Sequence, residues 1–115
     1  MTIGIDDMAL YVPKLYFDIR ALAEKRDIPY EKLSQGLGLH KMAICDAPED
    51  AATMAAEAVI ELIERNNIDP RHIGRVYLGT ESALDGAKPT ATYAVEMAQH
   101  RLAERWGPDC FRHCD

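Results

Sequence analysis

Residues 75–88 read RVYLGTESALDGAK and combine a short apolar run with a Gly-Thr pair and a carboxylate. The first four residues favour a strand, and the Gly-Thr pair that follows is typical of a sharp exit into a loop. We therefore expect a buried strand at residues 75–78. In open α/β sheets ligands bind beyond the carboxyl ends of the strands, which is where Glu81 would stand. Glu81 is thus a candidate general base, because a partly desolvated carboxylate is suited to moving protons. The alternative is an ordinary solvated loop carboxylate.

The first fifty residues predict a strand, two short helical segments and an extended stretch. Apolar and polar residues alternate over residues 3–12, which indicates an opening strand that Pro13 ends. Asp18 is placed to cap a helix that runs to about residue 26. Residues 29–34 can form a helical turn, and residues 41–44 a short extended stretch. Between them, Gly36 and Gly38 lack the third glycine and the preceding strand of a dinucleotide-binding loop, so we expect a backbone turn there.

Two longer helices are predicted in the rest of the chain. The acids and the proline at residues 46–50 are typical of a helix start, and Asn66-Asn67 with Asp69-Pro70 ends that helix. A further helix is expected from Pro89 and Thr90 to about Arg105, closed by Gly107-Pro108. Small apolar residues dominate both inner faces, which suits close packing: Ala52, Ala55, Ala56, Val59, Leu62 and Ile63 in the first, and Ala91, Ala94, Val95, Ala98 and Leu102 in the second.

Composition excludes several classes of protein. The chain has 115 residues, 13 Lys and Arg against 19 Asp and Glu, and a net charge of −6, so it offers no basic surface for nucleic acid. It contains no apolar run of membrane-spanning length and no secretory leader pattern. Three cysteines fit no disulfide framework and agree with a reducing compartment, so we expect a cytoplasmic protein that contacts neither nucleic acid nor membrane.

The segment around Glu81 resembles a known family. LGTESALD at residues 78–85, with Ala87-Lys88 behind it, is similar to the sequence around the catalytic glutamate of 3-hydroxy-3-methylglutaryl-CoA synthases of the bacterial type. GI at residues 4–5, YVP at 11–13, GLG at 36–38 and KM at 41–42 follow the order and spacing of that family. The resemblance implies an α/β fold, the amino-terminal part of a thiolase-like layered α-β-α-β-α fold. It also implies that residues 1–115 are an incomplete segment of a larger enzyme.

The resemblance implies a Claisen-type condensation of acetyl-CoA with acetoacetyl-CoA. A cysteine would carry the acetyl group, Glu81 would remove a proton from its methyl, and a histidine would act as acid. The family's cysteine and histidine lie beyond this segment, so Cys114 is not given the nucleophile's role. The resemblance implies no cofactor besides the coenzyme A thioesters that serve as substrates. It further implies a homodimer that is completed by the remainder of the same enzyme.

Coenzyme A contacts are implied at Pro29, Tyr30 and Lys32. Lys32 falls where the family has a lysine and can bind a phosphate as a point charge; the alternative is a surface lysine on an amphipathic turn. The family often has an acidic or small residue where this chain has Pro29 and Tyr30, which weakens contacts at those two positions.

Other functions remain as alternatives. A related enzyme could act on acetoacetyl groups carried by an acyl carrier protein, since it would share the glutamate motif. A free-standing α/β module could bind coenzyme A or a protein partner without catalysis. A zinc site at Cys110, His113 and Cys114 is disfavoured because a fourth ligand is missing, so no metal is expected. His72 precedes residues 75–78 and is expected to be structural.

Overall fold

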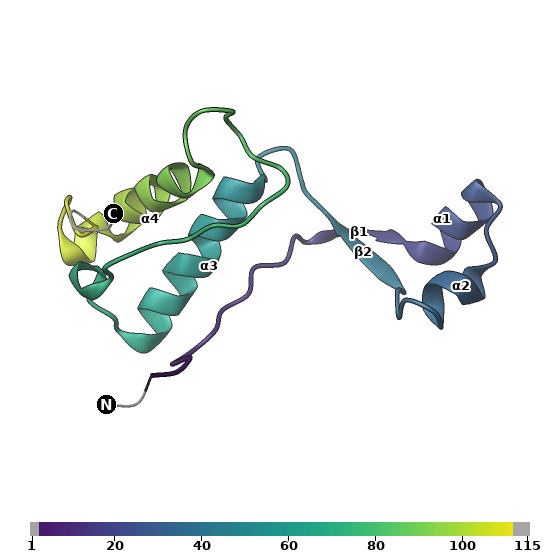
Figure 1. Cartoon of the computed structure of the whole chain (residues 1–115), viewed down its shortest axis with the longest axis horizontal. Helices are drawn as coiled ribbons and strands as arrows, with labels where there is room; N and C mark the ends of the chain where they lie inside the picture. Colours follow the sequence, from purple (N-terminus) through teal and green to yellow (C-terminus); the bar gives the residue numbers. More distant parts are fainter. Residues whose placement is uncertain (1–2, 112–115) are drawn as a thin grey trace. The chain divides into compact units, whose positions relative to one another are not determined.

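The computed structural model describes residues 3–111 and divides the chain into two compact units. One unit is Val12–Glu49, and the other joins Met1–Tyr11 to Asp50–Asp115. The first unit contains a strand pair and two short helices, and the second contains two longer helices (Figure 1). None of the helices in residues 3–111 is long and apolar enough to cross a membrane.

The unit Val12–Glu49 is built on a two-stranded antiparallel sheet. Strand β1, Leu15–Asp18, pairs with β2, Lys41–Ile44, in a register that sets Leu15 opposite Ile44 and Asp18 opposite Lys41. The amide of Ile19 donates to the carbonyl of His40 at 3.1 Å and extends the pairing by one bond. The predicted extended stretch at residues 41–44 is therefore confirmed.

Helix α1 begins at the predicted cap, and α2 follows it after a short break. The side chain of Asp18 accepts hydrogen bonds from the amides of Arg20 and Ala21, and α1 spans Ile19–Arg26. Asp27 ends it in the left-handed conformation, with φ of 51°. Helix α2, Tyr30–Ser34, is the predicted helical turn.

Helix α3 spans Ala51–Asn66 and begins with a reciprocal cap. The carboxylate of Asp50 accepts the amide of Thr53 at 2.8 Å, and the Thr53 hydroxyl accepts the amide of Asp50 at 2.8 Å. The predicted stop at Asn66-Asn67 is confirmed, since Asn67 is the left-handed C-cap. A short 3-10 helix, Pro70–His72, follows and is capped by Asp69.

Helix α4 spans Thr90–Trp106 and packs against α3 to form the core of its unit. Alanines at the contact bring the two helices close together, and larger residues fill the space toward one end. The buried residues of α3 and α4 are Ala52, Ala56, Ile60, Ile63, Thr90, Ala94, Ala98 and Leu102. Cys110 and Phe111 complete the cluster from the turn after α4.

Two predicted strands are wrong. Residues 3–12 and residues 75–78 both run without regular secondary structure, and Ile3, Ile5, Leu10 and Tyr77 are exposed by 81–95%. A strand needs a neighbour to receive its backbone hydrogen bonds, and within residues 3–111 only β1 and β2 pair in this way. Alternation and apolar content identified segments suited to strands, but not a partner for them.

Candidate functional site

Glu81 lies in the irregular connection between residues 73 and 89, which Figure 1 shows running from the 3-10 helix back to the start of α4. Its side chain is exposed, so the predicted burial of this carboxylate at the end of a strand is wrong for the described chain. The backbone bends at this point, and the amide of Ser82 donates to the Thr80 hydroxyl at 3.0 Å. The carboxylate is therefore accessible to a ligand.

The loop is fastened to α4 just after Glu81. The amide of Leu84 donates to Oγ1 of Thr90 at 3.4 Å, and Thr90 is only 6% exposed. One oxygen of Asp85 accepts the amides of Ala87 and Lys88 at 2.8 and 3.1 Å. Its other oxygen accepts the hydroxyl of Tyr93 at 3.0 Å.

These hydrogen bonds shift the pKa values of both Asp85 and Tyr93. The amides of Ala87 and Lys88 and the Tyr93 hydroxyl hold the pKa of Asp85 below its usual value. The same carboxylate raises the pKa of Tyr93, because the phenol must stay protonated to donate. At neutral pH the pair is a carboxylate and a phenol, which is an acceptor matched with a donor. An Asp followed closely by small residues is a turn signal in the sequence, but nothing in the sequence identified Tyr93 as its partner.

A hollow of about 460 Å³ lies beside this loop. Its wall includes Val76, Leu78, Thr80, Asp85, Lys88 and Thr90. The ammonium group of Lys88 lies 5.2 Å from the centre of the Tyr93 ring, within cation–π range. The wall of this hollow thus combines a cation with apolar surface, whereas Glu81 itself is not part of that wall.

The residues implied for coenzyme A lie in the other unit. Pro29 is the N-cap of α2, Tyr30 its first residue and Lys32 an exposed residue in its middle. Tyr30 Oη is 3.1 Å from Nδ1 of His40, and the Arg20 guanidinium lies 4.2 Å from the centre of the Tyr30 ring. Glu81 belongs to the unit of α3 and α4, so the four predicted site residues form two separate groups.

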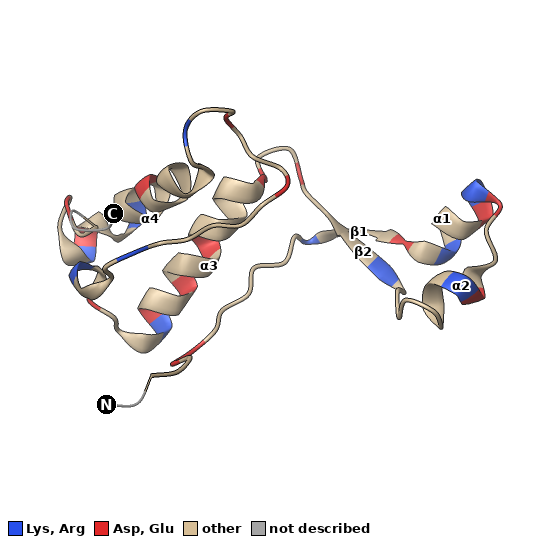
Figure 2. Ribbon diagram, viewed as in Figure 1, with Lys and Arg blue, Asp and Glu red and all other residues tan. Residues whose placement is uncertain are grey.

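Arg20, Pro29 and Tyr30 also line a hollow of about 420 Å³, whereas Lys32 is not part of its wall. The remaining wall includes three carboxylates, those of Glu24, Asp27 and Glu31. These carboxylates make the hollow poorly suited to phosphate. Lys32 is exposed outside it. Figure 2 shows both signs of charge interspersed along α1 and α2.

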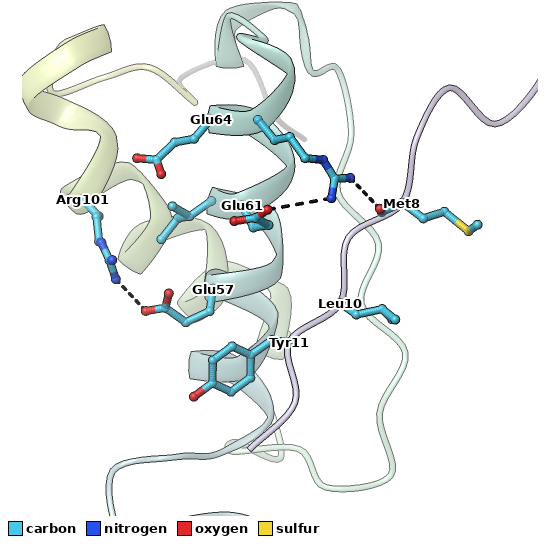
Figure 3. Close-up of a pocket in the computed structure, with 9 residues that line it drawn as sticks. Met8, Leu10, Tyr11, Glu57, Glu61, Glu64 and Arg101 are labelled. Carbon is cyan, nitrogen blue, oxygen red and sulfur yellow. Dashed lines mark hydrogen bonds and ion pairs between the residues drawn. The ribbon is translucent and has the colours of Figure 1, made fainter. Parts of the chain in front are cut away.

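Another hollow, of about 420 Å³, separates the segment around Met8 from α3 (Figure 3). Glu57, Glu61 and Glu64 line it, as do Arg65 and Arg101. Arg101 pairs with Glu57 at 2.6 Å, and Arg65 lies 3.8 Å from Glu61. Its cations are thus already engaged by carboxylates, and an anionic ligand would have to displace them.

Cys110 is buried in the helical core, and its burial raises the pKa of the thiol. The thiolate and not the protonated thiol is the nucleophile, so burial in the core makes Cys110 unreactive. Residues 3–111 contain no group of three or more His, Cys, Asp or Glu side chains placed to hold a metal ion. His113 and Cys114 lie outside the described residues.

Comparison with known proteins gives a consistent result. Residues 1–109 match the family model described as hydroxymethylglutaryl-coenzyme A synthase N terminal. The hydroxymethylglutaryl-CoA synthase of Haloferax volcanii is 40% identical over 93 residues, which are 80% of this chain and 21% of that protein. The synthase of Enterococcus faecalis is 38% identical over 102 residues, which are 89% of this chain and 25% of that protein.

Solved structures agree with these relatives. A structure of MvaS in complex with 3-hydroxy-3-methylglutaryl coenzyme A matches 84% of this chain and 23% of its own, with a TM-score of 0.76 and 38% identity. A synthase complexed with CoA matches 82% of this chain and 24% of its own, with a TM-score of 0.67 and 33% identity. The predicted fold class, an α/β part of a thiolase-like fold, is confirmed. The chain spans about a quarter of the length of these relatives.

Proposed function

The chain belongs to the hydroxymethylglutaryl-CoA synthase family, and we propose that it is the amino-terminal segment of an enzyme that condenses acetyl-CoA with acetoacetyl-CoA. The products would be 3-hydroxy-3-methylglutaryl-CoA and free CoA. Such an enzyme is an acyltransferase of the mevalonate pathway. Residues 1–115 would form part of one thiolase-like domain, and this segment alone would be inactive because it lacks the reacting cysteine and histidine.

The observation that carries the proposal is the place of Glu81 within the matched region. Its carboxylate is exposed on a loop that is fastened to α4 three and four residues later. A general base must reach the proton that it removes, and it must be held in place while it does so. An accessible carboxylate on a held loop fulfils both conditions.

In the proposed reaction Glu81 takes a proton from the methyl group of an acetyl-cysteine. The electron pair left on that carbon attacks the ketone of acetoacetyl-CoA, and the new carbon–carbon bond leaves an alkoxide that a histidine protonates. Water then hydrolyses the cysteine thioester and releases the product. The covalent intermediate divides one difficult reaction into easier steps. Of these three reacting groups, this segment would supply the glutamate, Glu81.

Coenzyme A contacts are proposed in the unit Val12–Glu49. That unit carries six Lys and Arg against six Asp and Glu, so the net charge of −6 resides in the other unit. A polyanionic ligand is repelled less by the neutral unit. Lys32 is the proposed phosphate contact, with Tyr30 and Pro29 beside it on α2. Coenzyme A thioesters would be the substrates, without a further cofactor.

Exposed apolar residues support contacts with the rest of such an enzyme. Ile3, Ile5, Leu10 and Tyr77 are each exposed by more than 80%. Large apolar side chains gathered in extended segments favour burial against a partner surface. We propose that these side chains pack against the remainder of the synthase, which supplies the cysteine and the histidine. The complete enzyme would form a homodimer. The cytoplasmic location stays a prediction of the sequence.

The test is an assay of the full-length protein that contains this segment. Purified protein is mixed with acetyl-CoA and acetoacetyl-CoA, and the product is identified by mass spectrometry. We expect 3-hydroxy-3-methylglutaryl-CoA and free CoA in equal amounts. A second reaction replaces acetoacetyl-CoA with acetoacetyl-acyl carrier protein. Product from the carrier-bound substrate alone, or no product from either, would overturn the proposal.

A further inference from the structure

Tyr93 is a residue for which the proposed reaction has no role, yet it contacts the Glu81 loop directly. It lies on the first turn of α4 and is partly buried. Its hydroxyl donates to Oδ2 of Asp85 at 3.0 Å, across eight residues of chain. The Lys88 ammonium lies over its ring at 5.2 Å.

The contact belongs to a set that fixes the loop at two successive residues. Thr90 and Tyr93 are three residues apart and so share one face of α4. Oγ1 of Thr90 accepts a hydrogen bond from the amide of Leu84, and the hydroxyl of Tyr93 donates one to the side chain of Asp85. The other Asp85 oxygen holds the amides of Ala87 and Lys88, which lead into the helix. The chain between this fixed part of the loop and Glu81 is therefore reduced to residues 82 and 83.

Of the two hydrogen bonds between the loop and α4, the one from Tyr93 is made to a charged acceptor. Bonds of that kind are stronger than bonds between neutral groups. Without the hydroxyl, Asp85 keeps its two bonds to amides of its own loop, but these do not connect the loop to the helix. The Leu84 amide would then be the remaining hydrogen bond that holds residues 82–88 to α4 among those described, and it is long at 3.4 Å.

We propose that Tyr93 is a positioning residue for the condensation: through Asp85 it holds the loop that presents Glu81 to the acetyl group. The inference rests on the proposed function of Glu81. It assigns Tyr93 no contact with substrate and no proton transfer. Its effect is on the position of the carboxylate, and a displacement of about 1 Å can lower a rate roughly 100-fold.

The test compares Tyr93→Phe with Tyr16→Phe in the full-length protein. Each removes one hydroxyl and keeps the ring, and Tyr16 lies in β1 with Lys41 over its ring at 4.2 Å. We expect Tyr93→Phe to lower kcat about 10- to 100-fold while KM for acetoacetyl-CoA and acetylation of the enzyme by acetyl-CoA stay unchanged. Hydrogen–deuterium exchange should accelerate in a peptide covering residues 79–89, and not in a peptide from α3. Tyr16→Phe should change none of these quantities.

Several outcomes would overturn the inference. One is an active wild-type enzyme whose Tyr93→Phe variant keeps the full kcat and the same exchange in residues 79–89. Another is a loss of acetylation together with kcat, or faster exchange throughout α3 and α4, since either would mean a general structural role. If the wild-type protein makes no product, the proposed function fails. In that case unchanged exchange in the Tyr93→Phe loop still refutes the positioning contact, so the two failures are distinguishable.

Discussion

Nη2 of Arg65 lies 2.6 Å from Oδ2 of Asp7 and joins residues that are 58 positions apart in the sequence. Asn66 donates to the same carboxylate oxygen at 2.6 Å, and Arg65 also donates to the carbonyl of Met8 at 2.7 Å. The extended amino-terminal residues are thus held on α3 by polar side chains rather than by sheet pairing.

This contact predicts a dependence of stability on pH. The hydrogen bonds from Asn66 and Arg65 lower the pKa of Asp7 from 3.8 to about 2. Because the folded state has the lower pKa, the stabilisation is complete above pH 3.8 and is lost as the pH falls from 3.8 toward 2. Asp7→Asn should therefore destabilise the protein near neutral pH and flatten its acid dependence in that window, as measured by denaturant unfolding at a series of pH values.

Asp69 provides an internal reference for this experiment. Its pKa is also lowered to about 2, by the hydrogen bond from Arg71, and it stays in place in the Asp7→Asn variant. The difference between variant and wild type therefore isolates Asp7. Parallel stability curves for the two proteins between pH 4 and pH 2 would contradict the assignment.

We predict that the chain can leave α2 as it does only with glycine at position 36. A Cβ at this position would overlap the carbonyl oxygen of Lys32, which is backbone and has little room to move. We expect Gly36→Ala to cost about 1–3 kcal/mol, as overpacking does elsewhere, and to disturb the helix that carries Lys32. Gly74→Ala is the matched control, because a Cβ there meets nothing within 4 Å. Equal unfolding free energies for the two variants would refute this steric account.

Lys32 is predicted to contribute to binding of the coenzyme A thioester. An exposed ion pair is weak, so we expect Lys32→Gln to raise KM for acetyl-CoA roughly two- to five-fold, with the effect fading at high salt. Lys25→Gln on α1 removes the same charge from a neighbouring helix and serves as the control. If both variants raise KM equally, the effect comes from the general field of the unit and not from a contact at Lys32.

The helices were largely predictable from the sequence because their limits are local. Asp18 and Asn67 act at the ends where their residue types are favoured. The predicted inner face of α3 is only partly confirmed. It omits Ile60, which is 4% exposed, and includes Leu62, which is half-buried. Ala56, Ile60 and Ile63 follow the spacing of four and three residues that defines one face of a helix.

The strands and the surroundings of Glu81 were less predictable because they depend on distant residues. Residues 75–78 have the composition of a strand, but composition does not supply a neighbouring strand. The bond between Tyr93 and Asp85 arises because the loop folds back onto α4, and no local pattern indicates that return. Glu81 itself was found by resemblance to a family motif, while its exposure could be learned only from the structure.

The most direct test of the central claim is the Glu81→Ala variant of the full-length protein, assayed separately for acetylation and for condensation. Glu96→Ala, which removes an exposed carboxylate from α4, is the control. We expect the Glu81 variant to take up the acetyl group normally, while condensation falls by at least about 10²–10⁴-fold because the general base is lost. Condensation at the wild-type rate in Glu81→Ala would contradict the account.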